Sequence, residues 1–283
     1  MASKHAAKGV LIASDLDGTL LRDDHTISVR SKDAILRVQQ AGAMFCLASG
    51  RPSFMLTVYQ NAVFNLNTPQ ISSNGAFVID PENGSVLHCS YLPHEPALRY
   101  IHFCWNEGLD FGIFTEQSVH FVHSPSRKKR YAAYNDLCDN HGQQRVKLNT
   151  IHSLAQAQKV LAENVLRISV AHRDENEEKK LLEYFRNNTD NIDLVHSIQE
   201  AYDVIPKGVN KWNAIRITAR YLGVSPNSIY VFGNDINDIE MLNNAPHSFA
   251  VANSISDVQQ AAKTIIPSNN NDGVAKTIEA LFL

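Results

Sequence analysis

The feature that most constrains this chain is the hexapeptide Asp-Leu-Asp-Gly-Thr-Leu at residues 15–20, one residue after the apolar run at residues 10–13. The apolar run predicts a buried strand, and Gly18 predicts a tight turn at its end. The turn carries two carboxylates, Asp15 and Asp17. One can act as a nucleophile toward phosphorus and the other as its proton donor. Because carboxylate and phosphate repel each other, this chemistry predicts a Mg²⁺ ion between them.

A second apolar run, at residues 44–48, predicts another buried parallel strand. Ser49 and Gly50 follow it, and Pro52 marks the expected start of a helix. A small hydroxyl and backbone N–H groups can converge on an anion at such a helix start. This segment therefore predicts part of a phosphate-binding site.

Lys211 lies at the expected start of a later helix. A lysine there opposes the helix dipole, which favours acidic groups at this end. We therefore expect an anion opposite Lys211. Lys207 competes for the same role, although most lysines are ordinary surface residues.

A later strand, expected at residues 228–232, leads into Gly-Asn-Asp-Ile-Asn-Asp at residues 233–238. This cluster of oxygen donors suits a hard cation such as Mg²⁺. The metal ligand can be the side-chain oxygen of Asn234 or the carboxylate of Asp235. Asn234 keeps the strand-to-loop register, but an amide ligand carries no charge and predicts weaker Mg²⁺ binding.

These four segments, in this order, resemble the four signatures of the haloacid dehalogenase superfamily, and they span residues 15–238. The Gly-Val-x-Lys spacing selects Lys211 over Lys207. Ser-Ser-Asn-Gly-Ala at residues 72–76 resembles a segment of the Cof-type branch (subfamily IIB), in which the residue equivalent to Asn74 faces the active-site opening. The chain departs from the usual Gly-Asp-x-x-Asn-Asp form at Asn234.

The resemblance implies an α/β fold: a Rossmann-like, doubly wound parallel sheet core with an inserted α/β cap domain of the C2 type. The long interval between Ser49 and Lys211 supports such an insertion. We expect the catalytic core at residues 1–82 and 203–283 and the cap at residues 83–202. Alternating strands and helices predict a small α/β layer in the cap.

The resemblance also implies a role for each matching residue. Asp15 would be the nucleophile and Asp17 the acid and base. The Asp15 carboxylate, the Asp17 carbonyl and Asn234 or Asp235 would hold Mg²⁺. Phosphate would be bound by Leu16, Ser49, Gly50, Lys211 and Asn237, with supporting roles for Thr19, Arg51, Asn74 and Asp238. Asp238 would orient Lys211 or a water on the metal.

Local patterns predict the remaining elements. Phe-Val-Ile at residues 77–79 and Val-Leu-His at 86–88 predict a hairpin that turns at Asn83-Gly84. Helices are expected at residues 31–41, 96–106 and 175–187, and another begins near 126. Strands are expected at residues 111–114, 119–122, 166–171 and 192–196. We expect the chain to return to the core at residues 202–206.

Composition excludes several classes of protein. The 283 residues carry 26 basic and 29 acidic side chains, so no nucleic-acid partner is indicated. Four scattered cysteines suit a reducing compartment. Residues 1–8 lack an apolar signal region, and no run is long enough to span a membrane. We expect a cytoplasmic protein with no membrane partner. The sequence makes no prediction of oligomeric state.

The leading hypothesis is a Mg²⁺-dependent phosphatase of small phosphorylated metabolites. Sugar phosphates are the first candidates, followed by nucleotides and by flavin and pyridoxal phosphates. A phosphosugar mutase is one alternative, which the net release of phosphate would distinguish. A weakly active phospholigand-binding protein is another, suggested by the missing carboxylate at Asn234.

Overall fold

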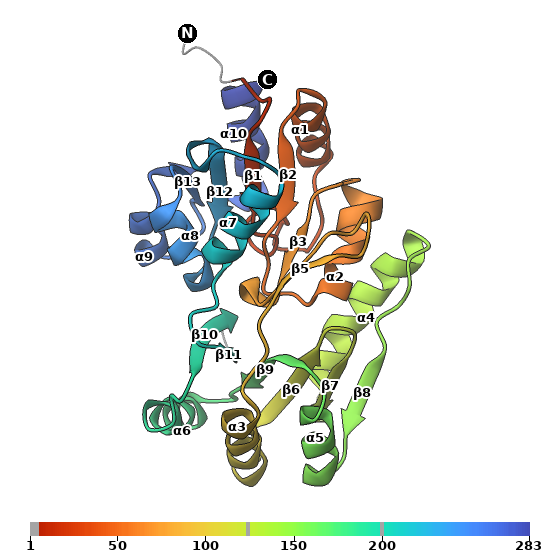
Figure 1. The fold of residues 1–283 in the computed structure, drawn as a ribbon, viewed down its shortest axis with the longest axis vertical. Coiled ribbons are helices and arrows are strands. Elements are labelled where there is room, and N and C mark those ends of the chain that lie inside the picture. The colour runs from red at the N-terminus through yellow and green to blue at the C-terminus, as the bar shows by residue number, and fades with distance from the viewer. Residues whose placement is uncertain (1–5, 123–124, 199–200) are drawn as a thin grey trace. The chain divides into compact units, whose positions relative to one another are not determined.

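The computed structural model describes residues 6–122, 125–198 and 201–283, and it divides into two compact units (Figure 1). The first unit holds residues 1–51, 59–88 and 210–283, and the second holds residues 52–58 and 89–209. None of the helices in the described part of the chain has the length and apolar character that crossing a bilayer requires.

The first unit is built on a five-stranded sheet in the order β14-β13-β12-β1-β2, with all neighbours parallel. Its strands are β1 (Leu11–Ser14), β2 (Met44–Leu47), β12 (Ile229–Gly233), β13 (His247–Val251) and β14 (Thr264–Ile266). β1 and β12 are buried along their whole length. These two central strands confirm the expected buried parallel sheet, since their near-continuous apolar runs have no solvent-facing side.

Helices pack on both faces of this sheet, which makes it doubly wound as expected. Leu11 and Ala13 share one apolar cluster with α7 (Lys211–Tyr221), α8 (Ile239–Asn244) and α9 (Ser256–Ala261). Helix α1 (Val29–Gln40) packs against α10 (Gly273–Phe282) and contacts β2. In such a sheet, ligands bind at the carboxyl ends of the strands.

A smaller antiparallel sheet completes the first unit, in the order β3 (Gln70–Ser72), β4 (Phe77–Ile79) and β5 (Val86–Cys89). β4 and β5 are the expected hairpin. Gly84 in its turn has φ 72°, which glycine adopts without steric cost.

The helix expected near Pro52 is short. α2 (Ser53–Thr57) passes into a π-helix at Val58–Val63, which the sequence analysis did not predict. Residues 52–58 group with the second unit, where the Tyr134 hydroxyl donates to the Phe54 carbonyl at 3.0 Å.

The second unit contains a six-stranded sheet in the order β10-β11-β9-β6-β7-β8. Its strands are β6 (Asp110–Thr115), β7 (Val119–Val122), β8 (Leu148–Ile151), β9 (Val165–Ala171), β10 (Ile192–Ile198) and β11 (Ala201–Pro206). Its helices are α3 (His94–Asn106), α4 (Pro125–Asn140), α5 (Leu154–Leu161) and α6 (Glu175–Arg186). α3, α5 and α6 share one apolar cluster with the sheet.

Residues 202–206 differ from the sequence expectation. They do not begin the return to the first unit but belong to β11, which pairs with both β9 and β10. The observed units change at 88/89 and 209/210, whereas the expected domains change at 82/83 and 202/203. An apolar strand pattern does not state which sheet the strand will join, and this explains the difference.

Candidate active site

Asp15 is the first residue after the central strand β1. Its N–H donates to the Phe232 carbonyl of β12 at 2.9 Å, which extends the parallel pairing by one residue. The side chain lies at the carboxyl edge of the sheet and is 7% exposed. The two flanking strands, β2 and β12, end at the same edge, so the loops that follow them are neighbours of Asp15.

Lys211 links Asp15 to a second buried carboxylate. Its Nζ donates to Asp15 Oδ1 and to Asp238 Oδ1, both at 2.7 Å. Lys211 and Asp238 are fully buried. Asn210 caps the helix by accepting the Asn213 N–H, so the helix start holds the lysine in place. The anion expected opposite Lys211 is therefore present within the protein itself.

These contacts set the protonation states. Burial raises the pKa of Asp15 to about 7, while the nearby Lys211 ammonium acts in the opposite direction. Burial would lower the pKa of Lys211, but Asp15 and Asp238 together raise it above its ordinary value. Lys211 is therefore a permanent cation. A divalent cation beside Asp15 would lower the pKa of this carboxyl.

Asp238 also organises the loop after β12. Its Oδ2 accepts the backbone N–H groups of Asn234 and Asp235 at 2.8 and 3.1 Å. The Asp235 carboxylate caps the same turn by accepting the Ile236 N–H at 2.7 Å. The Asp235 carboxylate therefore caps this turn, whereas the side chain of the other expected ligand, Asn234, lies beside Asp15.

The Asn234 amide lies among oxygens of the loop after β1, residues 15–20, which we call the first loop. One end of the amide is 2.9 Å from the Asp17 carbonyl oxygen, 3.1 Å from Asp15 Oδ2 and 2.8 Å from Thr19 Oγ1. With Oδ1 at that end, it accepts a hydrogen bond from Thr19. Asp15 Oδ2, the Asp17 carbonyl and Asn234 Oδ1 then form a set of oxygen donors that fits Mg²⁺. Within the described residues, no three His, Cys, Asp or Glu side chains are grouped so that they could hold a metal ion.

Arg51 holds the side chain of Asp17. Its Nε and Nη2 donate to the two carboxylate oxygens at 2.7 and 2.6 Å. Partial burial would raise the pKa of Asp17, but the Arg51 guanidinium outweighs it and holds the pKa below its usual value. Arg51 also lies over the ring of Tyr59, 5.2 Å from its centroid. Tyr59, in the π-helix, was not among the residues predicted from the sequence.

The loop after β2 is clamped by a strained segment. Ser73 and Asn74 have φ of 49° and 59°, in the left-handed region that costs non-glycine residues about 1–3 kcal/mol each. The N–H of Ser73 donates to the Arg51 carbonyl, and that of Asn74 donates to the Ser49 carbonyl, at 2.9 and 3.1 Å. A Cβ at Gly50 would lie 2.9 Å from Asn74 Oδ1, so the close approach needs glycine here.

Asn74 also connects the second and fourth signature segments. Its Oδ1 accepts a hydrogen bond from Asn237 Nδ2 at 3.0 Å. Ser49 is 1% exposed, and its Oγ accepts the Arg51 N–H at 3.1 Å. Leu16 is fully buried, and its carbonyl accepts the N–H groups of two residues in the following turn. The Asp235 backbone joins the same hydrogen-bond network at Asp238, while its carboxylate caps the turn after β12.

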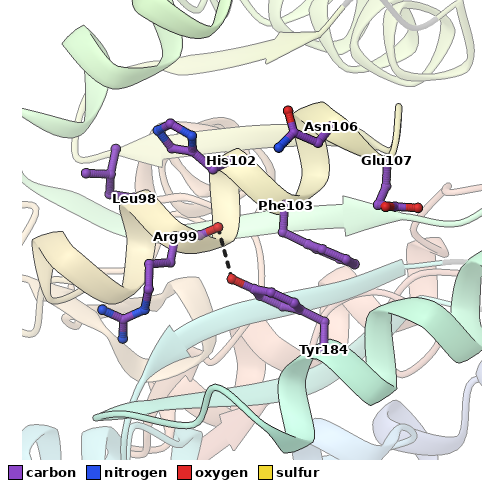
Figure 2. A pocket seen from close by; sticks show the side chains of 7 residues that line it. All are labelled: Leu98, Arg99, His102, Phe103, Asn106, Glu107 and Tyr184. Atoms are coloured by element: carbon purple, nitrogen blue, oxygen red, sulfur yellow. Dashed lines mark hydrogen bonds between the residues drawn. The ribbon is translucent and has the colours of Figure 1, made fainter.

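A different concave surface lies in the second unit, between α3 and α6 (Figure 2). Phe103 and Tyr184 stack there with ring centroids 3.9 Å apart. The Tyr184 hydroxyl donates to the Arg99 carbonyl at 3.2 Å, and the Arg99 guanidinium pairs with Asp190 at 2.9 Å. These contacts join two helices and assemble no paired carboxylates, so this surface is not a candidate for phosphate chemistry.

Comparison with known proteins agrees with this geometry. The sequence matches the family of haloacid dehalogenase-like hydrolases over residues 12–278. It is 30% identical to the 5-amino-6-(5-phospho-D-ribitylamino)uracil phosphatase YitU of Bacillus subtilis, covering 97% of this chain and 98% of that protein. It is 26% identical to the pyridoxal phosphate phosphatase YbhA of Escherichia coli, covering 95% and 97%.

Solved structures show the same fold. A haloacid dehalogenase-like hydrolase from Bacteroides thetaiotaomicron superimposes with a TM-score of 0.81 at 22% identity, covering 96% of this chain and 99% of that one. A sugar phosphatase of subclass IIB of the same superfamily superimposes with a TM-score of 0.80 at 23% identity, covering 96% and 98%. At these identities the likeness establishes the fold alone.

Proposed function

The chain belongs to the haloacid dehalogenase-like hydrolases and is a Cof-type phosphatase of small phosphorylated metabolites, and from this premise we propose a Mg²⁺-dependent reaction through a phosphoaspartate on Asp15. One observation carries the proposal. Asp15 is buried at the sheet edge, with Oδ1 bound by Lys211 and Oδ2 beside the Asn234 amide. A carboxylate oriented by a buried cation on one oxygen is prepared to act as a nucleophile.

We propose that Asp15 Oδ2, the Asp17 carbonyl and Asn234 Oδ1 hold the metal. Their mutual proximity supports this assignment, and the capping role of Asp235 argues against it as the ligand. When bound, Mg²⁺ supplies charge neutralisation between the nucleophile and the phosphate. Lys211 contributes a second positive charge that is always present.

Asp17 is proposed as the acid and base. It would protonate the leaving alcohol, and the resulting carboxylate would take a proton from the water that hydrolyses the phosphoaspartate. The bidentate pair with Arg51 opposes protonation of Asp17. Asp17 must therefore leave Arg51 before it donates its proton, and a phosphate dianion is the group that can compete for this guanidinium.

The remaining residues are proposed to hold the phosphate oxygens. The candidates are the backbone N–H of Leu16, Ser49, Gly50, Lys211 and Asn237. Asn74 would position Asn237 and the Ser49 loop through the contacts described above. Donors fixed in advance stabilise transition-state charge without reorganisation, which is what the strained Asn74 segment provides.

We propose that the first unit is the catalytic core and the second is a cap that selects the substrate. The relatives named above act on a phosphorylated ribityl compound and on pyridoxal phosphate. We propose a phosphate ester of a sugar or of a sugar-derived chain as the substrate.

The test is phosphate release from a panel of sugar, ribityl, nucleotide, flavin and pyridoxal phosphates, with and without Mg²⁺. Asp15→Asn should abolish turnover, whereas Asp33→Asn, on the exposed face of α1, should retain it. Acid-quenched Asp17→Asn protein incubated with p-nitrophenyl phosphate should carry phosphate on Asp15.

Other outcomes would redirect the assignment. Phosphate transfer within a sugar, without net release, would indicate a mutase. Ligand binding without turnover on any panel member would indicate a phospholigand-binding protein.

A further inference from the structure

The Asn234 amide can face the oxygens of the first loop with either end. With Nδ2 inward, it donates to the Asp17 carbonyl at 2.9 Å, to Asp15 Oδ2 at 3.1 Å and to Thr19 Oγ1 at 2.8 Å. With Oδ1 inward, it accepts from Thr19 and stands beside the Asp17 carbonyl oxygen and Asp15 Oδ2, with no N–H between these oxygens. The first orientation satisfies a metal-free site, and the second satisfies a site that holds a cation.

The first loop is shaped around this amide. Gly18 has φ 76°, and a Cβ there would lie 2.5 Å from the terminal atom of the Asn234 side chain. The Asn253 side chain donates to the Gly18 carbonyl at 2.8 Å and holds the loop from outside. The amide therefore lies in a space that only glycine at position 18 leaves open.

We propose that Asn234 is a two-state ligand, in which Nδ2 replaces the cation in the metal-free protein and a half-turn of the amide presents Oδ1 when the cation binds. This inference rests on the proposed metal site. An aspartate at the same position could do only the second task, since an ionised carboxylate has no N–H to donate to Asp15 Oδ2 or to the Asp17 carbonyl when the cation is absent. Compared with aspartate at this position, asparagine thus binds the metal more weakly but makes the metal-free state more stable.

The first experiment compares thermal unfolding and Mg²⁺ binding of the native protein and Asn234→Asp. In EDTA the variant should melt several degrees lower, about the shift of a 1–2 kcal/mol loss. Mg²⁺ should raise its melting temperature more than that of the native protein. Calorimetry should show at least about tenfold tighter Mg²⁺ binding, because the ligand set gains a full charge.

Asn253→Asp is the matched control. It adds the same charge next to the loop after β1, but from the loop after β13, where its side chain contacts the Gly18 carbonyl and the Asn269 N–H, so its Mg²⁺ affinity should change much less. The proposal is overturned if Asn234→Asp is as stable as the native protein in EDTA. It is also overturned if the two variants gain Mg²⁺ affinity equally.

The second experiment follows the amide itself. In protein labelled with ¹⁵N-asparagine, the Asn234 side-chain signals are those lost in Asn234→Asp. They should shift when Mg²⁺ is added, and those of Asn135, which donates to Val146 in the second unit, should not. Unchanged Asn234 signals at a Mg²⁺ concentration that saturates the calorimetric site would overturn the proposal.

Both readouts are independent of turnover. An inactive protein that shows the Mg²⁺-dependent shift would contradict the proposed function and keep this inference. An active protein without the Mg²⁺-dependent shift would support the proposed function and contradict this inference.

Discussion

Each unit of this protein buries a cation with a carboxylate, but the two arrangements differ in what surrounds them. In the first unit, Lys211 is bound by Asp15 and Asp238, and further proton acceptors lie beyond Asp15. In the second unit, Arg167 pairs with Asp203 at 2.5 Å and lies over the Phe114 ring, 3.8 Å from its centroid. A buried ion pair alone therefore does not mark an active site. What distinguishes the candidate active site is a carboxylate oxygen that faces other oxygens at the carboxyl edge of a parallel sheet.

The largest effect is expected for Lys211→Met. The change leaves two buried carboxylates without their cation, so the free energy of unfolding should fall by about 3–5 kcal/mol. The kcat/KM value should fall by at least about 10³-fold, because a fixed positive charge beside the nucleophile is lost. Chemical denaturation and steady-state kinetics measure the two effects. Lys207→Met, at an exposed position, should change stability by no more than about 0.5 kcal/mol. Activity within tenfold of native would contradict the role of Lys211.

Arg167→Met tests the buried ion pair of the second unit, which we expect to stabilise the fold without taking part in the reaction. It should cost about 3–5 kcal/mol of stability, because the buried Asp203 carboxylate loses its ion pair with Arg167. Adding Asp203→Leu should recover most of this loss. On p-nitrophenyl phosphate, kcat/KM of the folded single variant should stay within about tenfold of native. A fall as large as that of Lys211→Met would place Arg167 in the chemistry and break the distinction.

Gly18→Ala should act through both strain and contact. Its positive φ disfavours alanine, and the new Cβ would collide with the Asn234 amide at 2.5 Å. We expect a stability loss of about 2–4 kcal/mol and a fall in kcat of about 10²-fold. Gly84 in the hairpin turn has a similar φ but open space around its Cβ position. Gly84→Ala should cost only about 1 kcal/mol and leave activity intact. Equal effects on activity would show that the contact with Asn234 is unimportant.

The smallest effect is expected at the partly exposed Asp17–Arg51 pair. Since the pKa of Asp17 is lowered in the folded protein, the pair stabilises the fold above the ordinary pKa of 3.8 and loses its effect as the pH falls through the lowered value. Arg51→Met should therefore cost up to about 1 kcal/mol at pH 7, and progressively less as the pH falls below 3.8. Urea denaturation across this pH range measures the change. The surface pair formed by Arg37 should contribute about 0.3 kcal/mol. A cost independent of pH would mean that Arg51 acts by packing alone.

Local patterns were sufficient for much of the fold. The strands before Asp15, Ser49 and Asn234 lie where apolar runs end in polar loops, and the hairpin turns at the expected Asn-Gly. Each of these patterns is contained within a few consecutive residues, which is why sequence reasoning can find it.

Other features depend on residues far apart in the chain. β11 reads as an ordinary strand, and only its pairing with β9 and β10 assigns it to the second unit. Tyr59, whose ring Arg51 covers, lies in a π-helix, for which the sequence has no clear signal. The choice between Asn234 and Asp235 was open because both offer an oxygen at the same loop.

By itself the sequence determined the fold class, the family resemblance and the set of residues that meet at one sheet edge. It could do so because parallel strands that end in polar loops bring those loops together whatever lies between them. Only the tertiary structure decided which carboxylate caps a turn, which amide faces Asp15, and that Arg51 holds Asp17 in its charged form. Those outcomes depend on hydrogen bonds of 2.6–3.1 Å between side chains on different loops, and such distances are decided only when the loops are packed.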